Sequence, residues 1–267
     1  MVRPLAYGFL ALAVAACDPA APPPATWSDL DAARPDAAFL GGIGGSGLPR
    51  GGGGGTTTPP ACGARVLVVF DRSGSMNEPW LTPTSDDPLP RWRVASDAVT
   101  AALEPLAARI TAGAILFPTG LERAPDTCAE VAPIEAQISF RGGRAFLDAW
   151  AARWSTPEVG GSTPVDRAFA RAEEALPFDD EVTAVVLLTD GMPTCSEPTS
   201  AWDRAASFAR RDVKTWVVGL PGAAGLSVLD RIAAAGGTGA SLSVDDPAAL
   251  TSALSTIVSD AVEQACP

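Results

Sequence analysis

Hydrophobic residues follow two alternating patterns along most of this chain. Short apolar runs rich in β-branched residues, of which 65–70 (RVLVVF) and 183–188 (TAVVLL) are the clearest, are typical of strands buried on both faces. Between such runs the apolar side chains recur at helical spacing. In 91–109 they form one stripe that includes Trp92, Val99 and Leu106. From residue 62 onward the pattern therefore predicts strands that alternate with helices.

The same two patterns continue to the end of the chain. Further strands are predicted at 114–117, 131–138, 215–219 and 241–244, and further helices at 143–154, 164–176, 201–211, 226–234 and 247–262. Because Pro133 has no N–H group, we expect the strand 131–138 to lie at an edge of the sheet. This alternation indicates an α/β fold, a doubly wound sheet flanked by helices, and we expect one domain over 61–267. Ligands of such sheets bind at the carboxyl ends of the strands.

The first 60 residues have a different pattern. Arg3 precedes an apolar run at 5–16, which is too short for a bilayer span of about 20 apolar residues. The run ends in Val-Ala-Ala-Cys, which resembles the lipobox of bacterial lipoproteins and implies a signal peptide 1–16 and lipid attachment at Cys17. An ordinary secretory signal is the alternative. Residues 17–60 are rich in Pro and Gly and predict a tether, so we expect a lipid-anchored protein of the cell envelope, periplasmic or at the cell surface.

Composition removes several function classes. The chain has 31 acidic and 19 basic residues, a net charge of −12, which disfavours binding of nucleic acid through its phosphates. It has no histidine, which excludes Ser-His-Asp catalysis and histidine zinc sites. Any metal site must therefore use ligands other than histidine.

Small oxygen-bearing side chains follow the two clearest strands. Residues 71–75 (DRSGS) come directly after the first strand and 189–191 (TDG) after the second, while 160–164 (GGSTP) precede a predicted helix. If the first loop is extended, Asp71, Ser73 and Ser75 project to one side. Hydroxyl and carboxylate oxygens suit a hard divalent cation such as Mg²⁺, which keeps several of its waters.

The three segments together resemble the metal-ion-dependent adhesion site (MIDAS) of von Willebrand factor type A (VWA) domains. The family motif is D-x-S-x-S, a Thr in a second loop and an Asp in a third, and the resemblance covers about residues 62–265. It implies a mostly parallel sheet with one antiparallel edge strand. It also implies a metal site formed by Asp71, Ser73, Ser75, Thr163 and Asp190.

The resemblance implies a role for each of these residues. Ser73 and Ser75 would ligate the metal directly, as would Thr163 in a high-affinity state, with Ser162 as the alternative to Thr163. Asp71 and Asp190 would act mainly through metal-bound waters. An acidic residue of a protein partner would complete the octahedron. We expect Mg²⁺, with Mn²⁺ or Ca²⁺ as alternatives.

An insert at 77–90 departs from the plainest form of the family. It contains Trp80, several prolines and the pair Asp86-Asp87. As a loop at the metal face it could determine which partner binds, or it could be a solvated surface insert. The two aspartates could alternatively help to bind calcium.

Four cysteines remain once Cys17 is set aside as lipidated, and in an exported chain they suggest two disulfides with three possible pairings. We favour Cys62–Cys266, because these residues bracket the domain and the bond resembles the terminus-closing disulfide of some VWA domains. This pairing leaves Cys128–Cys195, a bond that would brace the metal-side loops. Four free thiols are the alternative if the chain is not exported.

The leading functional hypothesis is a membrane-anchored, non-enzymatic lipoprotein that binds a protein partner through a divalent cation. One alternative is a metal-dependent hydrolase in which Asp190 or Asp71 acts as the base. Another is a structural envelope component whose metal site is unused.

Overall fold

The computed structural model describes residues 63–81, 87–119, 128, 130–176, 181–195, 198–223 and 227–267. The predicted signal peptide 1–16 and tether 17–60 lie outside these residues, as do Cys17 and Cys62. The lipid anchor and the predicted domain boundaries therefore remain predictions.

A six-stranded sheet forms the centre of the described region. Its strands lie in the order β3-β2-β1-β4-β5-β6, and every neighbouring pair is parallel except β2 and β3. This confirms the predicted α/β fold with one antiparallel edge strand. The strands are β1 (Ala64–Asp71), β2 (Ile110–Phe117), β3 (Ile138–Gly142), β4 (Thr183–Thr189), β5 (Lys214–Gly219) and β6 (Leu242–Ser243).

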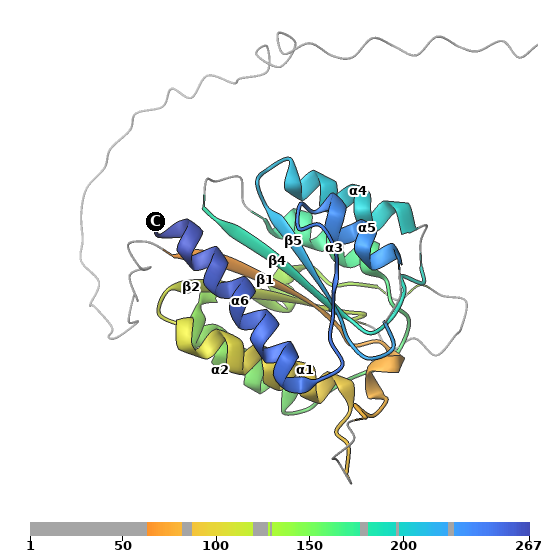
Figure 1. Ribbon diagram of the computed structural model, residues 1–267. Coiled ribbons are helices and arrows are strands. Elements are labelled where there is room, and N and C mark those ends of the chain that lie inside the picture. Colours follow the sequence, from red (N-terminus) through yellow and green to blue (C-terminus); the bar gives the residue numbers. More distant parts are fainter. Residues whose placement is uncertain are drawn as a thin grey trace, which may run out of the picture. The chain divides into compact units, whose positions relative to one another are not determined.

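Helices cover both faces of the sheet (Figure 1). One face packs against α1 (Arg91–Leu103), α2 (Gly143–Trp154) and α6 (Pro247–Ala265). The other packs against α3 (Val165–Ala175), α4 (Pro198–Ala209) and α5 (Ser227–Ala235). Within β1, Val68 and Phe70 belong to the first core and Leu67 and Val69 to the second, because successive side chains of a strand point to opposite faces.

The prediction of a strand at 131–138 was wrong. Ile134–Ala136 is a short 3-10 helix, η4, and the edge strand begins at Ile138. The side chain of Gln137 replaces the missing strand pairing: its Oε1 accepts from the backbone N–H of Leu116 at 2.6 Å, and its Nε2 donates to the carbonyl of Ala132 at 2.6 Å. A side chain thus satisfies backbone groups that a regular ladder would have paired.

The helix predicted at 91–109 is also shorter than expected. The α-helix ends at Leu103, and Glu104–Leu106 form a 3-10 turn, η3. Pro105 explains the change, because a proline ring clashes with the carbonyl of the preceding helical turn.

An aromatic cluster fixes the end of β1. The ring of Phe70, the residue before Asp71, lies 5.3 Å from Trp150 and 5.0 Å from Trp154, measured between centroids. Trp92 stacks on Trp154 at 5.2 Å. Such large buried rings hold the carboxyl end of the central strand in one position.

Among the residues that the structure describes, none of the helices is both long and apolar enough to cross a membrane.

Candidate metal centre

Three loops at the carboxyl ends of the strands are joined by backbone hydrogen bonds. The amide of Gly74 donates to the carbonyl of Gly161 at 3.0 Å, and the amide of Gly160 donates to the carbonyl of Arg72 at 2.9 Å. The third loop joins the second through the amide of Thr194, which donates to the carbonyl of Thr163 at 3.1 Å. The segments 71–75, 160–164 and 189–195, far apart in sequence, therefore form one structural unit.

Asp71 is fully buried and accepts hydrogen bonds from neutral donors. One carboxylate oxygen accepts from the amide of Ser73 at 2.7 Å, and the other accepts from the hydroxyl of Thr189 at 2.6 Å. Burial, and secondarily the nearby charge of Asp190, raises the pKa of Asp71 to about 7 against the lowering effect of these hydrogen bonds. Among the described residues, Asp71 therefore has no cationic partner of its own.

Ser73 and Ser75 lie together, but not in the way the sequence predicted. Ser73 is extended, whereas Gly74–Asn77 form a 3-10 helix, η2, so the loop does not continue in extended form to Ser75. The turn still brings the two hydroxyl oxygens within 3.1 Å of each other. The hydroxyl of Ser75 also donates to Oδ1 of Asp190 at 2.7 Å, which links the first loop to the third.

Asp190 has a cationic partner that sequence analysis missed. Its buried carboxylate accepts from Nη1 of Arg91 at 2.7 Å through Oδ2. Arg91 is the first residue of α1, and no acidic residue lies in that first turn. A cation is unfavourable at a helix N-terminus, so this position was the one signal in the sequence for a specific anionic partner.

Thr163 is positioned by its backbone. Its amide donates to the hydroxyl of Thr194 at 2.8 Å, its carbonyl accepts from the amide of Thr194, and the residue is buried. The hydroxyl of Ser162, the alternative ligand, accepts from the thiol of Cys195 at 3.2 Å. Thr163 therefore remains the preferred candidate.

The donor set fits a hard divalent cation. Asp71, Ser73, Ser75 and Asp190 are joined by the contacts above, and Thr163 lies on the loop bonded to both of the others. In the described part of the chain no three His, Cys, Asp or Glu side chains group as a metal site, so such a site depends on these hydroxyls. Oxygen ligands combined with two buried carboxylates are what Mg²⁺ or Mn²⁺ prefers.

Arg72, between the first two motif residues, points away from them. Its buried guanidinium donates to the carbonyl of Pro118 at 2.5 Å and to that of Glu158 at 3.2 Å. Burial, and secondarily the charge of Arg153, lowers its pKa to about 10. Arg72 therefore ties the first loop to the end of β2 and to the segment before the second loop.

The insert 77–90 is anchored at its base. Trp80 is buried and donates from its indole N–H to the carbonyl of Asp245 at 2.9 Å, while its amide donates to the carbonyl of Leu89 at 2.8 Å. Leu81 and Leu89 are 73% and 52% exposed. Asp86 lies outside the described residues. The described residues of the insert thus form an anchored base with two apolar side chains exposed to solvent.

The described cysteines fall into two groups. Cys266 is disulfide-bonded, but its predicted partner Cys62 lies outside the described residues. Cys128 and Cys195 are free thiols in the structure, so the predicted bond between them is not formed there. They are nevertheless neighbours: the thiol of Cys128 donates to the carbonyl of Cys195 at 3.1 Å. Hydrogen bonding to the Cys195 side chain is the largest cause that raises the pKa of Cys128, to about 11.

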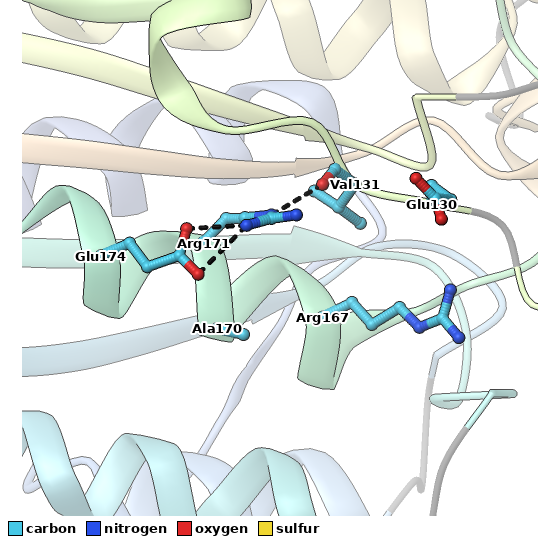
Figure 2. A pocket seen from close by; sticks show the side chains of 6 residues that line it. All are labelled: Glu130, Val131, Arg167, Ala170, Arg171 and Glu174. Carbon is cyan, nitrogen blue, oxygen red and sulfur yellow. Dashed lines mark hydrogen bonds and ion pairs between the residues drawn. The ribbon is translucent and has the colours of Figure 1, made fainter.

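Two hollows in the described surface lie away from the five candidate ligands. The larger, of about 350 Å³, lies beside α3, where Arg171 donates to the carbonyl of Val131 at 2.8 Å and pairs with Glu174 (Figure 2). The other, of about 300 Å³, lies between α1 and α2. None of the five candidate ligands lines either hollow.

Sequence comparisons find no relatives: no protein-family profile and no curated protein matches the chain. Solved structures do match. The conserved hypothetical protein BatB from Bacteroides thetaiotaomicron superposes with a TM-score of 0.55 at 17% identity, over 75% of this chain and 100% of that one.

Two further matches indicate which fold this is. The SpRpn10 VWA domain has a TM-score of 0.50 at 14% identity, over 76% of this chain and 95% of that one. Proximal thread matrix protein 1 from the mussel byssus, in a structure with a zinc-occupied MIDAS motif, has a TM-score of 0.50 at 18% identity, over 76% of this chain and 46% of that one. The described part of this chain therefore has the fold of VWA domains.

Proposed function

We propose that this domain binds an acidic group of a protein partner through a divalent cation. The observation that supports this function is a cluster of oxygen donors in which Ser73, Ser75 and Asp190 are connected by hydrogen bonds beside the buried Asp71. Ser73, Ser75 and Thr163 would hold the cation, and Asp71 and Asp190 would supply negative charge. The partner's carboxylate would coordinate the bound cation, because hard divalent cations prefer oxygen ligands.

The surroundings of the cluster suit a protein ligand better than a small substrate. Met192, two residues after Asp190, is 53% exposed, and the insert exposes Leu81 and Leu89. Exposed apolar side chains near a polar centre are common in protein interfaces. We therefore favour a binding module over a hydrolase.

A pull-down from envelope extract tests this function. The full-length chain and an Asp71→Asn variant are compared in Mg²⁺ and in chelator. The substituted amide keeps an oxygen for the backbone N–H of Ser73 but loses the charge. We expect partners to be captured in Mg²⁺ by the wild type and by the control Asp97→Asn, whose exposed carboxylate pairs with Arg93. They should be lost in chelator and from Asp71→Asn. Equal capture in chelator would contradict a metal-bridged contact.

We propose further that the chain is anchored to the cell envelope by lipid on Cys17, with 17–60 as a tether. An anchor of this kind would leave the domain free to reach a partner away from the membrane. Cys17→Ser should release the protein from the membrane fraction into the soluble fraction. Membrane association that persists in this variant would contradict the anchor.

We also propose that Cys128 and Cys195 form a disulfide after export. Formation would join the two sulfurs and pass two electrons and two protons to a thiol–disulfide oxidant of the envelope. Cys195 lies on the loop that holds Thr163, so the bond would brace that loop. Mass spectrometry of non-reduced peptides tests the pairing together with Cys62–Cys266, and any other pairing contradicts it.

A further inference from the structure

Arg91 places a fixed positive charge inside the candidate metal centre. Its Nη1 donates to Oδ2 of Asp190 at 2.7 Å, and its side chain is only 12% exposed. The other oxygen of Asp190 accepts from Ser75, one of the candidate direct ligands. The guanidinium therefore neutralises one of the two carboxylates that a metal would use.

The protein backbone forms a niche for this guanidinium. Gly222 has a φ of +104°, and a side chain at that position would meet Nη1 of Arg91 and the carbonyl of Asp190, each at 3.0 Å from its Cβ. Nε of Arg91 is buried without a hydrogen-bond partner among the described residues. A buried donor left unpaired costs free energy, so the contact with Asp190 has to compensate for an otherwise unfavourable position.

Arg91 has a second carboxylate partner nearer the surface. Its Nη2 pairs with Glu78 at 2.7 Å, and the side chain of Glu78 is 61% exposed. The backbone amide of Arg91 also donates to the carbonyl of Glu78 at 2.9 Å. If the contact with Asp190 is broken, the guanidinium keeps a partner, so Asp190 can be released without leaving a buried cation unpaired.

We propose that Arg91 is an intramolecular counter-ion of Asp190 that competes with the divalent cation and couples its binding to that of a carboxylate. This inference rests on the proposed function. With Arg91 in place, a divalent cation among Asp71 and Asp190 gives these four groups one excess positive charge, which the largely exposed carboxylate of Glu78 offsets only in part. That charge weakens binding of the cation alone and favours a carboxylate as the last ligand. The site therefore loads cation and acidic partner together.

Mn²⁺ titration of the full-length chain tests the inference, with free Mn²⁺ followed by electron paramagnetic resonance. Each protein is titrated in chloride and in acetate at equal ionic strength, acetate being the probe for the partner's carboxylate. In chloride, Arg91→Gln is expected to bind Mn²⁺ about tenfold more tightly than wild type does. Acetate should increase the Mn²⁺ affinity of the wild type, and most of this increase should be absent in Arg91→Gln.

Two matched variants separate this contact from a general charge effect. Arg93→Gln removes the same charge from an exposed pair on the same helix and should bind Mn²⁺ as wild type does. Glu78→Gln leaves Arg91 with Asp190 as its carboxylate partner and should weaken Mn²⁺ binding about threefold, more than Asp97→Asn does. Because Glu78 and Asp97 are largely exposed, this second comparison remains available if Arg91→Gln does not fold.

The outcomes distinguish the inference from the function on which it rests. If the wild type binds Mn²⁺ but Arg91→Gln binds no more tightly than Arg93→Gln, Arg91 is a structural ion pair and the inference is overturned while the metal site stands. If none of the proteins binds Mn²⁺, the proposed function fails and the inference with it. If Arg91→Gln binds Mn²⁺ and none of the other proteins does, the result supports the inference, because removal of the counter-ion alone then permits binding of the cation.

Discussion

At the scale of single residues, the centre contains two carboxylates in opposite situations. Asp190 pairs with a guanidinium, whereas Asp71 is buried among neutral donors. This difference was not visible in the sequence. Both aspartates follow buried strands, but the partner of Asp190 is 99 residues away along the chain, and only packing of the insert and α1 brings it close. The motif residues could be predicted because each lies in a short recognisable segment at a strand or helix end, whereas Arg91 belongs to no such segment.

Asp71 makes the stability of the metal-free protein depend on pH. Its pKa in the folded state, about 7, lies above the ordinary value of 3.8, so between these values the folded state holds a proton that the unfolded state has lost. The stability that this proton gives is complete below about pH 4 and is lost as the pH rises through 7. In chelator, the free energy of unfolding should fall by up to about 1.4 kcal/mol per pH unit across this range.

Urea unfolding of the chelated protein at several pH values between about 4 and 8 measures this dependence. Asp71→Asn should remove most of the slope, because the amide does not titrate. Asp97→Asn, which alters an exposed carboxylate on α1, should keep it. A slope that survives unchanged in Asp71→Asn would show that another group is responsible.

At the scale of elements, the sequence predicted where polar loops meet but not how each loop is built. The apolar runs located β1 and β4 to within a residue, so their carboxyl ends were placed correctly. The 3-10 turn at Gly74–Asn77 and the side-chain pairing of Gln137 were missed, since both depend on contacts with other segments. The insert was the most ambiguous element, and burial of Trp80 shows that its described base is anchored to the domain.

Trp80 should contribute strongly to stability. Trp80→Ala empties a buried site and leaves the carbonyl of Asp245 without its donor, so we expect a loss of about 4 kcal/mol in urea unfolding. Trp80→Phe keeps most of the packing and should cost about 1–2 kcal/mol. Leu81→Ala, at an exposed neighbour, should change stability by less than about 0.5 kcal/mol. Similar effects of Trp80→Ala and Leu81→Ala would show that the indole is not a structural anchor.

At the scale of the whole molecule, alternation of strands and helices predicted the architecture well because each layer buries a continuous apolar surface. The sheet order places β1 and β4 side by side at its centre. That adjacency brings Asp71 and Asp190 to one edge, as the VWA resemblance implied. Arg72 and Arg91 take their positions beside the centre from this three-dimensional arrangement. The local sequence pattern gives almost no indication of either contact.

A cation bound at this centre should stabilise the whole domain. At about one hundred times the dissociation constant, Mg²⁺ adds about 2.7 kcal/mol to the free energy of unfolding. For a domain of this size, that corresponds to a rise of about 5–10 °C in Tm. Scanning calorimetry should show the rise for wild type and Asp97→Asn, but little for Asp71→Asn. An equal rise in Asp71→Asn would place the stabilising cation elsewhere.

The edge strands of the sheet affect whether neighbouring copies of this protein aggregate. At one edge, β6 has only two residues, and at the other, β3 is short, carries Arg141 and pairs with β2 through a register shift. Long, flat edge strands are templates on which a neighbouring chain can add its own strand, and short, charged or irregular ones are not. Copies held close together by their tethers, as proposed here, should therefore stay separate rather than join through their sheets. Crowding would then raise the number of metal centres available to a partner without aggregating the domains that present them.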